Sequence, residues 1–204
     1  MSENGQEIEV KFYVQDLKRL EARLRKLKAR RVQSRVLETN IRFDLPDARL
    51  RAEGRVLRLR RDTDARLTYK GASKKEEGIL NREEIEFVVD DFGKARQFLE
   101  ALGYQKLVYY EKYRTTYELD ETLIMLDELP YGGFIEIEGE DVQSIRGLAD
   151  RLDLDWDAAV ATSYIALFER VRKVLKLSFS DISFANFAGI NVNPTDLDVE
   201  PADR

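Results

Sequence analysis

The sequence contains no cysteine and no histidine, and it has only four prolines and one tryptophan among 204 residues. Without cysteine there can be no disulfide and no thiolate metal site. Without histidine there is no Ser-His-Asp or Cys-His triad, no histidine general base and no histidine-ligated zinc. A metal ion would have to be bound by oxygen ligands, which suits hard cations such as Mg²⁺ or Mn²⁺.

Long apolar segments are also missing. A run of about 18 apolar residues, the length that crosses a membrane, does not occur, and the opening segment MSENGQEIEV lacks the apolar core of a signal peptide. We therefore expect a soluble, cytoplasmic protein without a membrane partner. The sequence has no GxxxxGK[ST] motif, so it does not support a P-loop phosphate site.

Charge is plentiful, but it nearly cancels. Charged residues make up 36% of the chain, and 34 Lys and Arg against 39 Asp and Glu leave a formal net charge of -5. This balance argues against a polybasic DNA-binding protein and against an acidic disordered chain. Hydrophobic residues make up 43%, so the chain can build one domain with a sizeable core, or one domain plus a tail.

Hydrophobic periodicity predicts an α+β fold. Alternation of charged and apolar residues predicts roughly eight strands, and apolar residues three and four apart predict four helices. The expected strands cover residues 7–14, 37–44, 55–61, 67–70, 81–89, 106–119, 123–129 and 134–138. The expected helices cover residues 17–27, 91–102, 142–152 and 157–175. We predict a lysine-rich loop at 71–78, one domain over 1–175, and a C-terminal extension over 176–204 that is partly packed and disordered at its end.

Several predicted strands carry two like charges two residues apart, with an apolar residue between them. The doublets are Glu7/Glu9, Arg58/Arg60, Glu84/Glu86, Lys112/Arg114 and Glu136/Glu138. A single doublet is the ordinary pattern of a half-solvated strand. Together they indicate a second possibility, because a sheet closed into a barrel would bring all the charged faces to one lumen. Such a lumen requires its charges to be paired, hydrated or bound to a ligand.

A lumen of this kind would suit a chain of phosphates with divalent metal ions. Arginine and lysine bind phosphate oxygens. Carboxylates beside phosphates hold the metals that bridge those oxygens. Phosphoryl transfer depends mainly on positioning and charge stabilisation, so the lack of histidine does not exclude it.

The ordered motifs resemble the CYTH superfamily, the triphosphate tunnel metalloenzymes. Residues 7–11 match its ExExK signature. The resemblance continues through LRLR at 57–60, LTYKG at 67–71, REEIE at 82–86, EKYR at 111–114, LD at 126–127, FIEIE at 134–138 and SY at 163–164. The resemblance covers about residues 5–170. Within the superfamily, the sequence is most similar to the branches labelled class IV adenylyl cyclase-like and thiamine triphosphatase-like. The resemblance implies an eight-stranded antiparallel tunnel, a closed barrel with helices outside.

The resemblance also implies roles for individual residues. The triphosphate would be bound by Lys11, Arg58, Arg60, Lys70, Lys112 and Arg114. Mg²⁺ or Mn²⁺ would be held by Glu7, Glu9, Asp127, Glu136 and Glu138. The catalytic set would be Glu7, Glu9, Lys11, Glu136 and Glu138. Glu84 and Glu86 would either order the basic side chains or contact metal through water.

Three functions remain open at this stage. The leading hypothesis is a metal-dependent hydrolysis of a small triphosphate, either inorganic triphosphate or an organic one such as thiamine triphosphate. The alternatives are a class IV adenylyl cyclase, which forms cyclic AMP and pyrophosphate from ATP, and a non-catalytic polyphosphate-binding module. The expected partner is a small-molecule triphosphate, not DNA, and the protein is expected to be a monomer or a homodimer.

Overall fold

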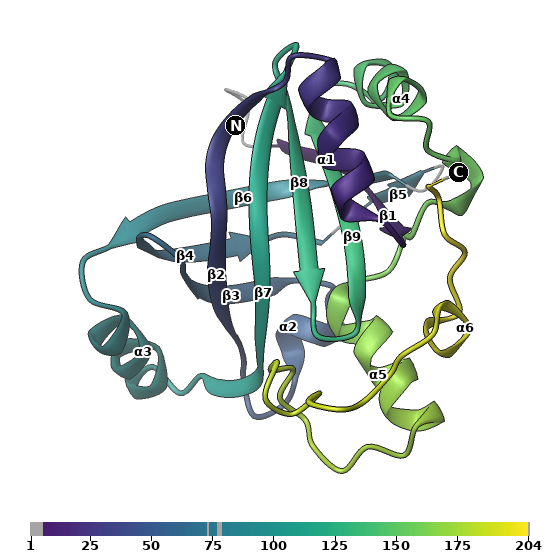
Figure 1. Ribbon diagram of the computed structural model, residues 1–204. Coiled ribbons are helices and arrows are strands. Elements are labelled where there is room, and N and C mark those ends of the chain that lie inside the picture. The colour runs from purple at the N-terminus through teal and green to yellow at the C-terminus, as the bar shows by residue number, and fades with distance from the viewer. Residues whose placement is uncertain (1–5, 73, 77–78, 204) are drawn as a thin grey trace.

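The computed structural model describes residues 6–72, 74–76 and 79–203, and for 6, 7, 74–76 and 79–81 it describes the backbone alone (Figure 1). The strands are β1 (Gln6–Val14), β2 (Arg30–Asp44), β3 (Val56–Arg61), β4 (Ala65–Lys70), β5 (Lys74–Glu76), β6 (Ile79–Val89), β7 (Gln105–Leu119), β8 (Thr122–Leu129) and β9 (Gly132–Gly139). The helices are α1 (Leu17–Lys26), α2 (Arg49–Ala52), α3 (Phe92–Ala101), α4 (Val142–Arg151), the 3-10 helix η1 (Trp156–Ala158), α5 (Tyr164–Val174) and α6 (Pro194–Leu197).

The strands form one antiparallel sheet in the order β1-β9-β8-β7-β2-β3-β4-β6-β5. Its first strand also pairs with β6, through the register Gln6↔Glu83 to Glu9↔Leu80. The predicted α+β class and the eight-stranded antiparallel arrangement are thus confirmed. The predicted full closure into a barrel is not shown by this ladder, which joins only residues 6–9 of β1 to β6, whereas the other edge of β1 pairs with β9 from Ile8 to Val14.

The ninth strand, β5, corrects the predicted loop at 71–78. Its residues Lys74 to Glu76 pair with Asn81 to Ile79 of β6. The segment Lys-Lys-Glu has no apolar alternation, so periodicity could not identify it as a strand. Its backbone hydrogen bonds to β6 define it. Similarly, β2 begins at Arg30 rather than at residue 37, because it pairs along the whole of β7.

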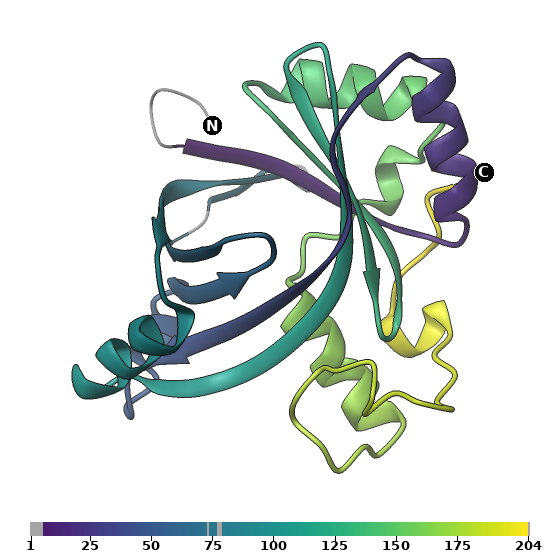
Figure 2. The same ribbon diagram turned by 60° about the vertical axis from the view of Figure 1, so that its left-hand side comes forward.

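Helices cover the outer face of the strongly curved sheet (Figure 2). The apolar side chains of β1, β8 and β9 form one cluster with α1 and α4, including Phe12, Leu20 and Ile145. The apolar side chains of β2 and β3 form another with α2 and α3, including Phe43 and Leu99. Because one face of each strand is used in these clusters, the residues between them must face the other side of the sheet.

The helix predicted at 157–175 begins later than expected. Trp156–Ala158 forms the short η1, and α5 begins at Tyr164. The hydroxyl of Ser163 accepts a hydrogen bond from the backbone N–H of Ala166, so Ser163 is the N-cap. This start places the Tyr164 ring at the inner end of the helix.

The C-terminal extension packs along the domain and returns to its first strand (Figure 1). Ile182, Phe187 and Leu197 are buried against α5. The carboxylate of Asp203 accepts hydrogen bonds from the backbone N–H groups of Gln15 and Asp16, at 2.8 Å each. The prediction of a disordered end is therefore wrong as far as Asp203, because these contacts hold it. Arg204 lies outside the described residues.

Among the described helices, none has both the length and the apolar character needed to span a membrane.

Candidate active site

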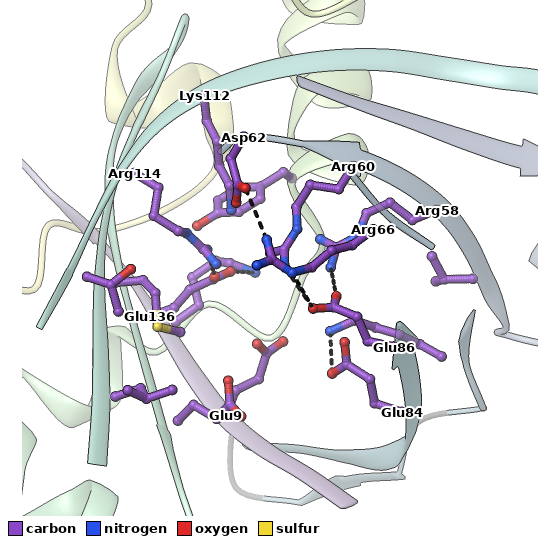
Figure 3. A pocket seen from close by; sticks show the side chains of 18 of the residues that line it. Glu9, Arg58, Arg60, Asp62, Arg66, Glu84, Glu86, Lys112, Arg114 and Glu136 are labelled. Atoms are coloured by element: carbon purple, nitrogen blue, oxygen red, sulfur yellow. Dashed lines mark hydrogen bonds and ion pairs between the residues drawn. The ribbon is translucent and has the colours of Figure 1, made fainter. Parts of the chain in front are cut away.

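A cavity of about 760 Å³ lies against the inner face of the sheet. Within the described residues, nine cationic side chains and six carboxylates line it. The cations are Lys11, Arg42, Arg58, Arg60, Arg66, Lys70, Arg82, Lys112 and Arg114. The carboxylates are Glu9, Asp62, Glu84, Glu86, Glu136 and Glu138. Figure 3 shows arginines of β3, β4 and β7 and carboxylates of β1, β6 and β9 pointing toward one another across it.

The structure brings together all six residues predicted to bind triphosphate, Lys11, Arg58, Arg60, Lys70, Lys112 and Arg114. It also places Glu9, Glu136, Glu138, Glu84 and Glu86 on the cavity wall. Two predicted metal ligands differ. Glu7 belongs to β1, but its side chain lies outside the described residues. Asp127 is fully buried and is not part of the cavity lining.

Asp127 lies beneath the wall at the centre of an ionic cluster. Its carboxylate accepts hydrogen bonds from Nε and Nη2 of Arg114 at 2.7 and 2.6 Å, and from Nζ of Lys112 at 2.9 Å. The hydroxyl of Tyr164 donates to the same carboxylate at 2.9 Å. These contacts fix the direction of both cations. We infer that Asp127 positions Lys112 and Arg114 rather than binding metal itself.

Glu136 is the cavity carboxylate next to this cluster. Arg114 donates a hydrogen bond to it, and Nζ of Lys11 lies 3.1 Å from its other oxygen. Burial alone would raise the pKa of Glu136, but the cations Lys11, Lys112 and Arg114 outweigh burial and hold that pKa well below its usual range. The same attraction raises the pKa of Lys11 despite its burial. The residues therefore stay ionised together.

The opposite wall carries a second ionic cluster. Glu86 accepts hydrogen bonds from Nη2 of Arg60 at 2.9 Å and from the hydroxyl of Thr68 at 2.7 Å. Nζ of Lys70 lies 3.1 Å from Glu84. Of the two roles predicted for Glu84 and Glu86, these contacts correspond to ordering the basic side chains.

Glu38 is a buried acidic residue that the sequence interpretation missed. Its carboxylate accepts a hydrogen bond from the amide of Asn40 at 2.9 Å and lies 3.6 Å from Nζ of Lys112 and 3.5 Å from Arg60. It thus bridges the two ionic clusters from β2. Burial would raise its pKa, but Lys112, Arg114 and Arg60 outweigh burial and hold the pKa far below the ordinary value of 4.5.

Because the surrounding cations depress its pKa, Glu38 is a source of acid sensitivity. A depressed pKa contributes stability above the unfolded value of about 4.5, and this stability is lost as the pH falls below it. We expect the free energy of unfolding of Glu38→Gln, measured with urea between pH 7 and 3, to fall less steeply than that of the wild type. Below pH 4.5 the difference in slope should approach about 1.4 kcal/mol per pH unit, the value for one proton. Glu140→Gln, at an exposed position, is the control, and an equal slope in Glu38→Gln would refute the expectation.

The donor chemistry of one wall fits a divalent metal, although the described residues contain no assembled group of three metal-binding side chains. Glu9 and Glu138 are direct partners in the β1–β9 ladder, and Glu136 follows on the same face of β9. Oxygen donors of this type bind Mg²⁺ and Mn²⁺. Glu9, Glu136 and Glu138 therefore fit a metal, whereas Asp127, which is fully buried and not part of the cavity lining, does not.

One part of the cavity wall is neutral. Two residues beyond Arg114 on β7, Thr116 pairs with Met125 of β8 on one side and with Gln33 of β2 on the other. All three line the cavity, and the Thr116 hydroxyl donates to the side-chain oxygen Oε1 of Gln33 at 3.4 Å. Register shifts flank Gln33 in β2, and such irregularities commonly redirect side chains next to functional sites. An uncharged part of a ligand could therefore lie against this wall, next to a charged part that contacts the ionic side chains.

Comparison with known proteins agrees with this arrangement. The protein is an α+β protein in which an antiparallel sheet, with helices on its outer face, has a cavity lined by charges of both signs against its inner face. Residues 5–155 match the CYTH domain family, and because this is more than half of the chain, the protein belongs to that family. The membership predicted from the ordered motifs is confirmed.

This chain matches individual relatives over nearly their whole length. A Methanocaldococcus jannaschii protein, MJ0240, whose name proposes an adenylate cyclase, is 26% identical over 172 residues, 79% of this chain and 97% of its own. A Vibrio parahaemolyticus structure, also named as a proposed adenylate cyclase, has a TM-score of 0.70 at 20% identity, covering 84% of this chain and 99% of that chain. A Hippeastrum structure, HpAC1, described as having a dominant triphosphatase activity, has a TM-score of 0.60 at 19% identity, covering 80% and 95%. These structural likenesses concern the fold.

Proposed function

We propose that the protein hydrolyses a small triphosphate in a reaction that depends on a divalent metal. The observation that carries the proposal is the convergence of nine cations and six carboxylates on one cavity among the described residues. We further propose that the β1–β6 ladder closes the eight main strands into a tunnel around the substrate. A tunnel would keep the phosphates among the charged side chains from several strands at once.

The basic residues supply the binding energy in this proposal. Arg58, Arg60 and Lys70 approach the phosphates from β3 and β4, and Lys112 and Arg114 approach from β7. Their hydrogen bonds to phosphate oxygens are charge-assisted. The carboxylates that hold these side chains in the free protein keep them directed inward, which reduces reorganisation when the substrate arrives.

The acidic wall supplies the second part of the chemistry. A divalent ion held by Glu9, Glu136 and Glu138 would neutralise charge on the phosphates and activate the attacking water. Glu136 must then exchange its contacts with Lys11 and Arg114 for the incoming cation. Both side chains become available to phosphate oxygens at the same moment. Substrate and metal are therefore expected to bind cooperatively.

An adenylyl cyclase reaction is the second candidate, and the neutral wall of Gln33, Thr116 and Met125 is the observation that favours keeping it. This wall offers space for an organic group such as a nucleoside. A cyclase would use the same charges but would direct the ribose 3'-hydroxyl at the α-phosphorus. A hydrolase directs water at the γ-phosphorus. The products, rather than the charges, distinguish the two reactions.

A product assay over a panel of triphosphates tests the proposal. The protein is incubated with tripolyphosphate, thiamine triphosphate or ATP, in Mg²⁺ or Mn²⁺ and with EDTA as the control. Ion-exchange chromatography then separates the products. We expect phosphate and the corresponding diphosphate, and loss of turnover in EDTA. Formation of cyclic AMP and pyrophosphate from ATP would refute the hydrolase proposal and support the adenylyl cyclase. Tight binding without turnover in either metal from pH 6 to 10 would favour the non-catalytic binding module.

A further inference from the structure

The cations of the cavity are not equally compensated by carboxylates. Arg114 has contacts of 2.7 and 2.6 Å with Asp127 and a further one with Glu136. At the other end of the charged region, Arg58 lies 3.7 Å from Glu86 and Arg82 lies 3.6 Å from Glu9. Arg42 of β2 lines the same end of the cavity, and unlike these two arginines it forms no recorded ion pair among the described residues. It is not one of the residues that the family resemblance indicated.

Arg42 makes no hydrogen bond and no ion pair that the structure records among the described residues. Its Nε is buried and has no hydrogen-bond partner. The acidic residue two positions further along β2 is Asp44, whose charge attracts Arg42 although no ion pair between the two is recorded. The Asp44 carboxylate accepts hydrogen bonds from the backbone N–H groups of Leu45, Leu50 and Arg51, which begin the α2 turn. A largely enclosed guanidinium without a partner is costly.

The neighbours of Arg42 increase this cost. Arg42 pairs directly with Arg58 in the β2–β3 ladder, and like charges in direct cross-strand pairs are destabilising. Both residues line the cavity, as does Arg82 of β6. Burial lowers the pKa of Arg42, and the positive charges of Arg58 and Arg82 lower it further, although Tyr110 and Asp44 partly oppose this. Arg42 is thus repelled by both neighbouring guanidiniums, whereas Tyr110, Glu38 and Glu84 hold the pKa of Arg58 above its ordinary value despite its burial.

We propose that Arg42, Arg58 and Arg82 form a subsite for the terminal phosphoryl group of the substrate. This proposal rests on the proposed function and adds a position and two residues, Arg42 and Arg82, to it. A terminal phosphoryl group has three free oxygens and close to two negative charges near neutral pH. Guanidinium forks match such oxygens in pairs. An internal phosphate has two free oxygens and one charge, so it would satisfy fewer of these donors.

The subsite also gives the substrate a direction in the cavity. Gln33 and Arg42 both belong to β2, and the pairing of that strand places Gln33 beside Thr116 and Arg42 beside Val108 of β7. The arginine subsite and the neutral wall are therefore at opposite ends of the lining of β2 and β7. The terminal phosphoryl group at Arg42 leaves the remainder of the molecule directed toward Gln33, Thr116 and Met125.

Calorimetric titration with a linear and a cyclic phosphate tests the subsite. Linear tripolyphosphate has terminal phosphoryl groups, whereas cyclic trimetaphosphate has none. Arg42→Gln should weaken the binding of tripolyphosphate by about 10- to 100-fold, and it should change the affinity for trimetaphosphate much less. Arg42→Lys keeps the charge but lacks the forked guanidinium, so its affinity for tripolyphosphate should lie between those of the wild type and Arg42→Gln. This variant replaces Arg42→Gln in the test if Arg42→Gln does not fold. Arg30→Gln, on the exposed part of the same strand, should leave both affinities unchanged.

The outcomes separate this inference from the proposed function. If both Arg42 variants bind tripolyphosphate as tightly as the wild type, or lose affinity for both probes equally, the terminal subsite is refuted while the triphosphate site stands. If the wild type fails to bind tripolyphosphate with or without Mg²⁺, the proposed function itself is wrong. A selective loss for the linear probe supports both.

Discussion

Replacing Asp127 by alanine is expected to destabilise the protein by about 3–5 kcal/mol, the usual cost of removing one partner from a buried ion pair. Asp127 is fully buried and accepts hydrogen bonds from Lys112, Arg114 and Tyr164. Without it, two buried cations lose a shared counter-charge. Denaturant unfolding at pH 7, with the free energy extrapolated to zero denaturant, measures the loss.

A neighbour on the same strand provides a matched control. Glu128 also forms an ion pair, with Arg35 at 2.7 Å, but its side chain is 42% exposed. Exposed pairs contribute about 0–1 kcal/mol, so Glu128→Ala should stay within that range. If Asp127→Ala were no more destabilising than Glu128→Ala, the cluster beneath the wall would not have the positioning role assigned to it.

Replacing Glu136 by glutamine is expected to lower turnover of the triphosphate by about 100-fold or more. The substitution keeps the shape of the side chain and removes the charge that faces Lys11 and Arg114. The affinity for tripolyphosphate without metal should be retained or increased, because the two cations no longer have to leave a carboxylate. The metal concentration that gives half-maximal turnover should increase.

Steady-state kinetics at several Mn²⁺ concentrations, together with calorimetric binding of tripolyphosphate, separate these effects. Glu140→Gln, an exposed position just beyond β9, should behave as the wild type. Unchanged turnover and metal dependence in Glu136→Gln would remove this carboxylate from the proposed chemistry. A parallel loss of binding and turnover would instead indicate that the charge of Glu136 is needed to hold Lys11 and Arg114 in place.

The inner face of the sheet could be predicted from the sequence because charge and apolarity alternate along the strands. In β3, Arg58 and Arg60 alternate with Leu57 and Leu59, and the leucines are buried beneath α3. The same alternation in β9 places Glu136 and Glu138 on the opposite face from Ile135 and Ile137. Period two specifies the face of each residue, but it does not specify which residues of other strands come near.

Arg42, Glu38 and Tyr164 show where sequence reasoning was insufficient. Arg42 and Glu38 lie inside the strand predicted over 37–44, but the residues they approach depend on the pairing of β2 with β3 and β7. Tyr164 reaches Asp127 because α5 begins at Ser163, far along the chain from β8. Glu38, Asn40 and Arg42 are alternate residues of one strand and so share one face, which was the available signal. The uncharged Asn40 between the two charged residues hid the pattern.

The sequence by itself determined the α+β class, the family and the set of charges that alternate on one side of the strands, because these depend on local periodicity and ordered motifs. The tertiary structure alone decided which charges meet. It moved Asp127 beneath the wall, brought Glu38 between two ionic clusters and left Arg42 opposite Arg58 without an ion pair in the described part of the chain. The physical reason is that electrostatic partners depend on strand register and on distances between segments remote in the chain, and neither is encoded in the pattern of a single strand.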